Sequence, residues 1–477
     1  MPDSPGVRCA APHASLPARL GAFFHSCFYW DRSFLRNMLL IALPLALQEL
    51  VAASLHIVDG MMVSGLGDAA YSGVNQANRF TFIFQLFLFG ISSGGSIFFS
   101  QFWGVKDIRR IRQAMGLTLL MAVGTSLFFS LAGLLFPHQI VALFLLPGES
   151  FELAVQYLRV IAPGYILSAV SLVYAMAIRA AEKPHLPMIA SVVGFLLNTF
   201  FNYVLIYGKL GFPILGVEGA AISTVLSFAV ILAINLIFAY GKHLPAGARL
   251  REMICRDMAF IRRFFQTTLP VLANEGLWSM GVTAYSVFYG RMGDVSVAAV
   301  NVTATISDLV WVLFFSITNA SAIMVGKTLG AGDRDKAYLY AKRFLAGGLA
   351  CGLAFGLLLA LLRLPLVSLF AGLSQDTRDK AQLLLLIASA GLWARAFNCV
   401  NVVGVLRSGG DTVFSMLLDT SVLWLVGVPL VGLGSLVFRW PIELVYLCTL
   451  VDEFLKIFIA IPRFVSRKWI HVLTEKA

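Results

Sequence analysis

The chain has 477 residues, of which 59% are hydrophobic and 13% are charged, and its formal net charge is +11. Soluble domains average about 45–50% apolar and about 25% charged residues. A soluble core could not hide this much apolar surface, so most soluble classes are excluded. The positive charge does not indicate a nucleic-acid partner, because the basic residues form short clusters between apolar runs and no single patch with interleaved aromatics.

Residues 1–35 contain no continuous apolar run and no clear cleavage site, so we expect a cytoplasmic tail and not a signal peptide. Apolar stretches of about 20 residues follow, each long enough to cross a bilayer as a helix, with polar or Gly- and Pro-containing joints between them. The first six form a predicted N-lobe of residues 36–240 and lie near 36–58, 73–101, 114–136, 152–178, 186–207 and 216–240.

The longest internal joint, residues 241–263, is rich in charge and divides the chain into two halves. Six further apolar stretches form a predicted C-lobe of residues 264–462, and a second tail covers residues 463–477. These stretches lie near 264–289, 297–325, 344–370, 381–406, 413–437 and 441–462. The sequence therefore predicts an all-α polytopic membrane protein with twelve transmembrane helices in two six-helix lobes.

Lysine and arginine residues indicate which joints face the cytoplasm. If the first tail is inside, the inside segments carry about four times as many basic residues as the outside joints, which is the bias of cytoplasmic loops. We therefore expect an integral protein of the cell membrane (plasma or inner membrane) with both termini in the cytoplasm. The outside joints keep only Lys209, Arg291, Arg363, Arg378, Lys380 and Arg439.

The two halves repeat each other at one constant offset along the sequence. Matches between leucines are expected by chance in apolar spans, so the polar, proline and glycine matches carry the argument. Six spans return the chain to its starting side, which makes the halves parallel repeats, an arrangement of secondary transporters. The matches at this repeat offset are Pro44 with Pro270, Glu49 with Glu275, Asp68 with Asp294, Asn75 with Asn301, Gly104 with Gly330 and Asp107 with Asp333; after a shift by two more positions, Arg179 matches Arg407.

An ordered set of motifs accompanies this repeat. In the first half the runs are VDGMMVSGLGD at 58–68, GISSGG at 90–95, QFWG at 101–104, IRAAEKP at 178–184, NTFFNYVLIYG at 198–208 and GVEGAAIST at 216–224, and the second half echoes them with GKTLGAGD at 326–333 and LRSGGDT at 406–412. Over residues 35–465 the chain resembles the MATE (multidrug and toxic compound extrusion) family. The resemblance implies two six-helix lobes in a V, a central cavity, and export of amphipathic, often cationic compounds against inward Na⁺ or H⁺ flow.

The resemblance also singles out Asp59, because the family carries an aspartate here, grouped with polar residues of span 5. Asn198 and Asn202 are four residues apart, so they share one helix face. Their carbonyl oxygens could complete a hard-ion or hydrogen-bonded proton site around the carboxylate. Part of the family has Asp at the position of Asn202, so the choice between Na⁺ and H⁺ stays open. The alternative for Asp59 is an interfacial carboxylate that water solvates.

Other ionisable residues lie inside predicted spans, where charge is costly and by default indicates an ion or substrate pathway. Glu275 is a fourth ion-coupling candidate, since the family frequently uses an acid in span 7. Glu49, Asp308 and Asp419 are secondary candidates, and for Glu49 and Glu275 the alternative is a neutral, hydrogen-bonded acid. Arg395, in the middle of span 10, needs an acid of the second lobe, and we expect Glu275 or Asp308 to supply it.

The function that these features predict is a secondary active antiporter working by alternating access, with no cofactor beyond its coupling ion. Its expected partners are small organic, often cationic substrates and membrane lipids, and we expect a monomer. A flippase for lipid-linked precursors is the alternative, but it should show extra spans or several basic residues in its cavity, and only Arg395 lies in the middle of a span. The chain lacks the HExxH motif and clustered histidines, and GISSG at 90–94 fits GxSxG only as a run of small residues inside an apolar span, so we expect no enzyme; the six cysteines show no metal-ligand spacing.

Overall fold

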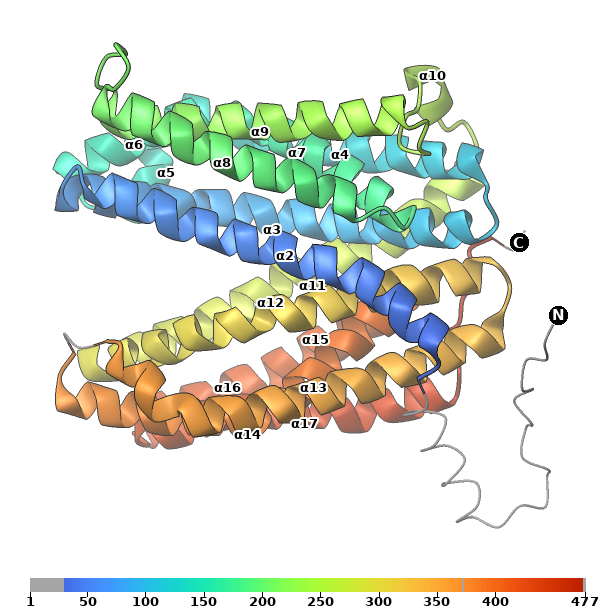
Figure 1. Cartoon of the computed structure of the whole chain (residues 1–477). Helices are drawn as coiled ribbons and strands as arrows, with labels where there is room; N and C mark the ends of the chain where they lie inside the picture. Colours follow the sequence, from blue (N-terminus) through green and yellow to red (C-terminus); the bar gives the residue numbers. More distant parts are fainter. Residues whose placement is uncertain (1–29, 371–372, 475–477) are drawn as a thin grey trace.

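The computed structural model describes residues 30–370 and 373–474, and every regular element within them is helical. Figure 1 shows two helical bundles that approach each other at the end where the first helix begins and diverge toward the other end. The first-half helices are α2 (Arg32–Ser64), α3 (Asp68–Gly104), α4 (Ile108–Leu135), α5 (Pro137–Ala142), α6 (Glu149–Ile161), α7 (Gly164–Ala180), α8 (His185–Tyr207) and α9 (Gly216–Gly241).

A short helix, α10 (Leu250–Met253), lies in the joint between the halves. The second half contains α11 (Met258–Gly290), α12 (Asp294–Gly330), α13 (Arg334–Ser368), α14 (Gln375–Cys399), the wider-turned η1 (Val400–Leu406), α15 (Thr412–Val422), η2 (Leu423–Gly427), α16 (Val428–Gly432), η3 (Leu433–Val437) and α17 (Ile442–Val465). The repeat is visible in helix length, since α2 and α11 both have 33 residues and α3 and α12 both have 37.

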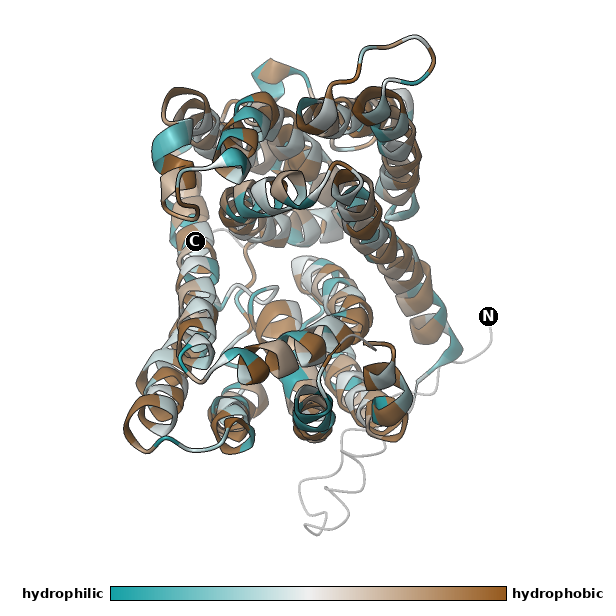
Figure 2. Ribbon diagram, turned by 90° about the vertical axis from the view of Figure 1, so that its left-hand side faces the viewer, coloured by the Kyte–Doolittle hydropathy of each residue, from teal (hydrophilic) through white to brown (hydrophobic). Residues whose placement is uncertain are grey.

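The predicted twelve-helix architecture is confirmed. Nine helical segments of the described residues are long and apolar enough to span a membrane, and the pair α6–α7, bent by 51°, makes a tenth. With α11 and α17, the two remaining long helices, the total is twelve. Large apolar side chains such as Leu40 and Phe128 are 59% and 68% exposed, and Figure 2 shows apolar residues along the outer faces of both bundles. Such surfaces are stable only against lipid tails, so the protein is an integral multi-pass membrane protein.

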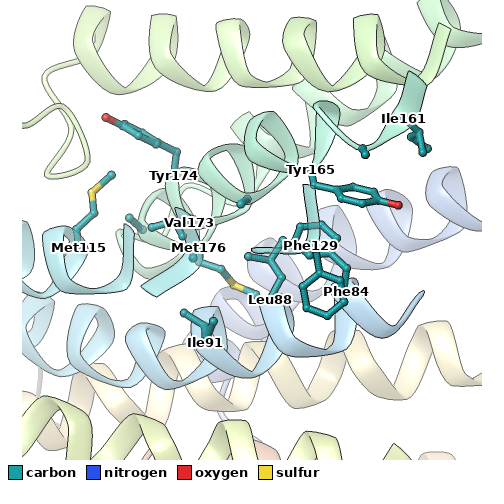
Figure 3. Packing of buried hydrophobic residues seen from close by; sticks show 14 of the residues in the cluster. Phe84, Leu88, Ile91, Met115, Phe129, Ile161, Tyr165, Val173, Tyr174 and Met176 are labelled. Atoms are coloured by element: carbon teal, nitrogen blue, oxygen red, sulfur yellow. The ribbon is translucent and has the colours of Figure 1, made fainter. Parts of the chain in front are cut away.

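Aromatic packing holds the first bundle together between α3, α4 and α7. Phe84 of α3 stacks on Tyr165 of α7 with ring centroids 4.6 Å apart, and Phe129 of α4 lies 5.6 Å from Phe84. Figure 3 shows these rings beside Leu88 and Ile91 of α3. All of these side chains are buried. Aromatic pairs at such distances add about 0.5–1.5 kcal/mol each to the effect of burial.

The first helix of each repeat crosses from one bundle to the other. The first half of α2 packs in the apolar core of the second bundle through Phe34 and Leu45. The first half of α11 packs in the core of the first bundle through Phe260 and Phe264. The spatial bundles therefore exchange these half-helices, and they do not coincide with residues 36–240 and 264–462. Figure 1 shows the two crossings in blue and yellow-green.

Two ion pairs fasten the crossings at their starts, each through an N-cap acid at the equivalent position of its repeat. Asp31 caps α2 and lies 2.6 Å from Arg343 of α13, whereas its repeat equivalent Asp257 caps α11 and lies 2.9 Å from Arg110 of α4. Partial burial raises the pKa of Asp31, but hydrogen bonds from Ser33, the backbone amide of residue 34 and Arg343 outweigh it and lower this pKa to about 2. Each N-cap acid of one repeat is therefore held by an arginine of the other.

The bundles meet closely where α3 and α12 end, which we call the closed end. A Cβ atom on Gly104 would overlap the carbonyl oxygen of Lys327, and one on Gly330 would overlap that of Gln101. The side chain of Gln101 donates to the Ser408 carbonyl at 2.9 Å and accepts from the amide of residue 473 at 2.7 Å. Glycine at both helix ends is required for this approach, because any side chain would separate the bundles.

Candidate functional site

Asp59 of α2 and the two asparagines of α8 form one polar cluster inside the first bundle. Asn202 donates from Nδ2 to Asp59 Oδ1 and, at 3.0 Å, to Asn198 Oδ1. Asn198 and Asn202 are 0% and 1% exposed, and Asp59 is half-buried. The four-residue spacing does place both amides on one face of α8, and the structure brings that face against Asp59. Their role in ion coupling stays a prediction.

Two further contacts fix α2 against α8 on either side of this cluster. Gln48 donates to Ser191 Oγ at 2.9 Å, and the hydroxyl of Tyr207 donates to the Met62 carbonyl at 2.8 Å. These bonds hold the register of the two helices, so Asp59 lies opposite Asn202. A polar group that is buried in a membrane helix is stable only with such partners.

The cluster retains unused hydrogen-bonding capacity. Asn202 Oδ1 and Asn198 Nδ2 are buried without a partner within the described residues. One carboxylate and two amides supply the oxygen ligands that a hard cation prefers, and the same carboxylate could take a proton. The donor set therefore fits either coupling ion.

The predicted pairing of Arg395 with Glu275 or Asp308 is wrong. Glu275 Oε1 lies 2.6 Å from Nη1 of Arg407, and both side chains are buried, with 11% and 3% of their surfaces exposed. The predicted span ends at residue 406, whereas in the structure Arg407 is the C-cap of η1 and its side chain is buried. Arg395 instead donates to Thr449 Oγ1 of α17 at 3.4 Å.

The acids that face Arg395 are Asp452 and Glu453 of α17, whose charges act on its guanidinium. Glu453 also accepts from Asn398 at 2.7 Å. Neither acid was anticipated from the sequence. The signal was present, because DEFLK at 452–456 places three charged residues inside an otherwise apolar run.

Asp419 of α15 belongs to a buried charge network with the same helix. Its Oδ1 lies 2.8 Å from Lys456 Nζ, its Oδ2 accepts from Asn274 of α11 at 3.1 Å, and Asp452 lies 3.7 Å from Lys456. Lys456 is therefore compensated on two sides, as a buried ammonium must be. This arrangement indicates a structural network in the second bundle.

The same contact in the two halves has different chemistry. Gln48 and Asn274 are repeat equivalents, and their partners Ser191 and Asp419 match at the offset that pairs Arg179 with Arg407. The first-half contact is neutral, whereas its second-half equivalent is charged and recruits Lys456. The halves thus keep one geometry with diverged chemistry.

Glu49 and Asp308 make no hydrogen bond or ion pair within the described part of the chain. Glu49 is half-buried in α2, and its charge acts on the buried Arg179 of α7 without a bond between them. Asp308 lies on an exposed face of α12. Glu49 therefore lies within electrostatic reach of Arg179, whereas Asp308 has no neighbour within the described residues that indicates a role.

A cavity lies between the bundles near the closed end. Its walls come from α3, α7, α12 and the η1 end, and Arg179 and Arg407 both line it. The predicted spans 152–178 and 381–406 each end one residue before these arginines, so the basic lining of the cavity was not predicted. The signal was that the two arginines match each other in the repeat.

The comparisons with known proteins agree with this architecture. The family model described as MatE matches residues 44–204 and 270–432, more than half of the chain. The probable multidrug resistance protein NorM of Thermotoga maritima is 22% identical over 91% of this chain and 93% of its own length. The multidrug resistance protein MdtK of Edwardsiella ictaluri is 24% identical over 84% of this chain and 87% of its own.

Two solved structures show the same fold. The bent form of the Vibrio cholerae MATE transporter VcmN has a TM-score of 0.81 at 17% identity, and a MOP superfamily transporter from Pyrococcus furiosus has 0.81 at 19%. Each match covers 91% of this chain and 96% of the other. At such identity the likeness concerns the fold alone.

Proposed function

Because this chain belongs to the MatE family, we propose that it is a secondary active antiporter that exports small amphipathic drugs or metabolites, often cationic ones, in exchange for Na⁺ or H⁺. The observation that carries the proposal is the Asp59–Asn202–Asn198 cluster. A carboxylate inside a membrane helix is costly and by default marks an ion pathway. Here it faces amides with unused capacity, which suits an ion that binds and leaves.

The crossing of α2 supplies a route from this cluster to the interface between the bundles. Asp59 lies in the part of α2 that packs on α8, while Phe34 and Leu45 pack in the other bundle. Pro44 lies beside Leu45, near the end of the part that packs in the other bundle, and removes one helical hydrogen bond, which creates a site for bending. Ion binding at Asp59 would therefore bias the position of α2 relative to the second bundle and, by linkage, the affinity for substrate. Alternating access is the function that this arrangement supports.

The test is dye efflux from proteoliposomes with a Na⁺ gradient and a pH gradient imposed separately. Asp59→Asn keeps the shape of the side chain but removes the titratable charge, so we expect normal insertion and loss of gradient-driven efflux. Asn198→Ala and Asn202→Ala should weaken efflux less. Asp68→Asn is the matched control, since Asp68 is exposed at the start of α3. Unchanged efflux by Asp59→Asn under either gradient would show that the coupling site lies elsewhere.

A flippase for lipid-linked precursors is the second candidate function, and one observation favours it. The alternative required several basic residues in the cavity, and Arg179 and Arg407 line it. Proteoliposomes with a fluorescent polyprenyl phosphate in one leaflet test this function. Translocation that needs Arg179 but no ion gradient would support the flippase, whereas gradient-driven dye efflux without lipid translocation would exclude it.

A further inference from the structure

The cavity between the bundles lies on the axis that relates the two repeats. Its walls include two pairs of repeat equivalents, Ser93 with Asn319 and Ile97 with Ile323, as well as the two matched arginines. The cavity has a volume of about 30 Å³, enough for a small polar group, and it is partly open to its surroundings. Equivalent residues of both bundles therefore face one compartment, where a single ligand can contact both.

The charge of this compartment is positive. The described residues that line it include Arg179 and Arg407 and no Asp or Glu. Arg407 already has a counter-charge, because Glu275 lies 2.6 Å from it. The guanidinium of Arg179 has none at bonding distance within the described residues.

Arg179 is 6% exposed, its Nε is buried without a partner, and its Nη1 lies 3.8 Å from Met176 Sδ. A thioether is only a weak acceptor. A buried guanidinium cannot lose its proton and is costly without an anion. Glu49 acts on Arg179 only through space, whereas the equivalent Glu275 has closed on Arg407. The two halves thus differ, and no carboxylate of the described residues accepts a hydrogen bond from Arg179.

We propose that this cavity binds the anionic group of an amphiphilic organic substrate, with Arg179 as its direct ligand. The planar guanidinium fork matches a carboxylate, phosphate or sulfonate. The hydroxyls of Ser93 and Ser96 line the same wall, and Phe89 and Ile323 offer apolar surface for the rest of the molecule. This inference rests on the proposed transport function and adds to it one class of substrate, amphiphilic organic anions.

Glu49 then becomes the competitor of the substrate. When the anion leaves, Glu49 could close on Arg179 as Glu275 has closed on Arg407, because the two acids and the two arginines occupy matching positions of the repeat. Removing the carboxylate should therefore strengthen anion binding, while removing Arg179 should weaken it. Because the two substitutions should change the affinity for the anion in opposite directions, they distinguish a direct binding site from a general loss of folded protein.

The experiment measures binding to the full chain in an uncharged detergent by isothermal titration calorimetry. The probes are naphthalene-2-sulfonate and its neutral isostere naphthalene-2-sulfonamide. Hydrogen bonds to a charged group are worth about 1.5–3 kcal/mol, so Arg179→Gln should weaken sulfonate binding roughly ten- to a hundredfold. Arg179→Lys should fall between, Glu49→Gln should bind tighter, and Arg159→Gln, an exposed arginine of α6, should match the unmodified protein.

The sulfonamide should bind the unmodified protein no better than the sulfonate binds Arg179→Gln. Equal affinity for the two probes, or for the unmodified protein and Arg179→Gln, would overturn the proposal. If Arg179→Gln does not fold, Arg179→Lys and Glu49→Gln still decide it, because their effects on a folded protein have the stated signs. Unchanged binding in both would likewise overturn it.

Two further arms identify the source of the anion and separate this inference from the coupling mechanism. In nanodiscs, competition of phosphatidylglycerol, but not phosphatidylcholine, with the sulfonate would identify a lipid headgroup, and its absence a soluble organic anion. Asp59→Asn should keep sulfonate binding although it loses efflux. Efflux that survives Asp59→Asn would refute the coupling site without affecting the anion site. Sulfonate binding that does not depend on Arg179 would refute the anion site without affecting the coupling site.

Discussion

The buried pair between Glu275 and Arg407 allows a quantitative test of what holds the bundles together. Glu275 lies at the interface of α11 with α3, since a Cβ atom on Gly90 would lie 3.3 Å from its Cγ. The ion pair distance is 2.6 Å, and at most 11% of either side chain is exposed. Breaking such a pair from one side leaves an uncompensated charge and costs about 3–5 kcal/mol. We therefore expect Glu275→Gln to lower the free energy of unfolding by this amount.

Removing the other partner, by Arg407→Gln, should lower the free energy of unfolding less, because the two partners differ in their ability to become neutral. Glu275 without Arg407 can take a proton, whereas Arg407 without Glu275 keeps its charge. We therefore expect Glu275→Gln to lower the free energy of unfolding more than Arg407→Gln does. The exposed pair Lys380–Asp376, at 3.1 Å, is the control, and its loss should cost at most about 0.5 kcal/mol.

The assay is unfolding by SDS in mixed micelles, followed by far-UV circular dichroism, for both single variants and the double variant. The double variant should recover about 1–3 kcal/mol relative to the sum of the single changes. Losses that add within about 0.5 kcal/mol would show that the two side chains do not interact, and the geometry of the bundle interface would then be refuted.

Three more expectations concern orientation, pH and closure. In a cysteine-free background, Gly148→Cys should react with an impermeant thiol reagent from outside the cell and Leu250→Cys should not; the reverse pattern would refute the cytoplasmic termini. The pKa of Asp31 is lowered to about 2, so its contribution to stability should be full above about pH 4 and lost as the pH falls through about 2. If the unfolding midpoint of Asp31→Asn depends on pH in the same way as that of the unmodified protein, this expectation is contradicted. Gly330→Ala should separate α3 from α12 and lengthen spin-label distances across the closed end, whereas Gly276→Ala, which has open space around it, should leave them unchanged.

Local sequence features decided the helices of this protein. Apolar length predicts the spans because a bilayer requires it, and the repeated N-cap acids, such as Asp107 and Asp333, start equivalent helices in the two halves. The spacing of Asn198 and Asn202 likewise predicts a shared face, because helical periodicity depends on sequence alone. The resemblance then indicated that this face meets Asp59, which the structure shows.

Only the tertiary structure decided which charges meet. Sequence positions place Arg395 and Glu275 in spans 10 and 7, but the rotation of each helix about its axis determines which neighbour a side chain faces, and packing of all twelve helices sets that rotation. Arg407, counted in a joint, turned out to hold Glu275, and the acids of α17 face Arg395. The sequence by itself therefore determined the elements and their symmetry, while the crossing of α2 and α11 and the positive cavity arise from packing between distant segments.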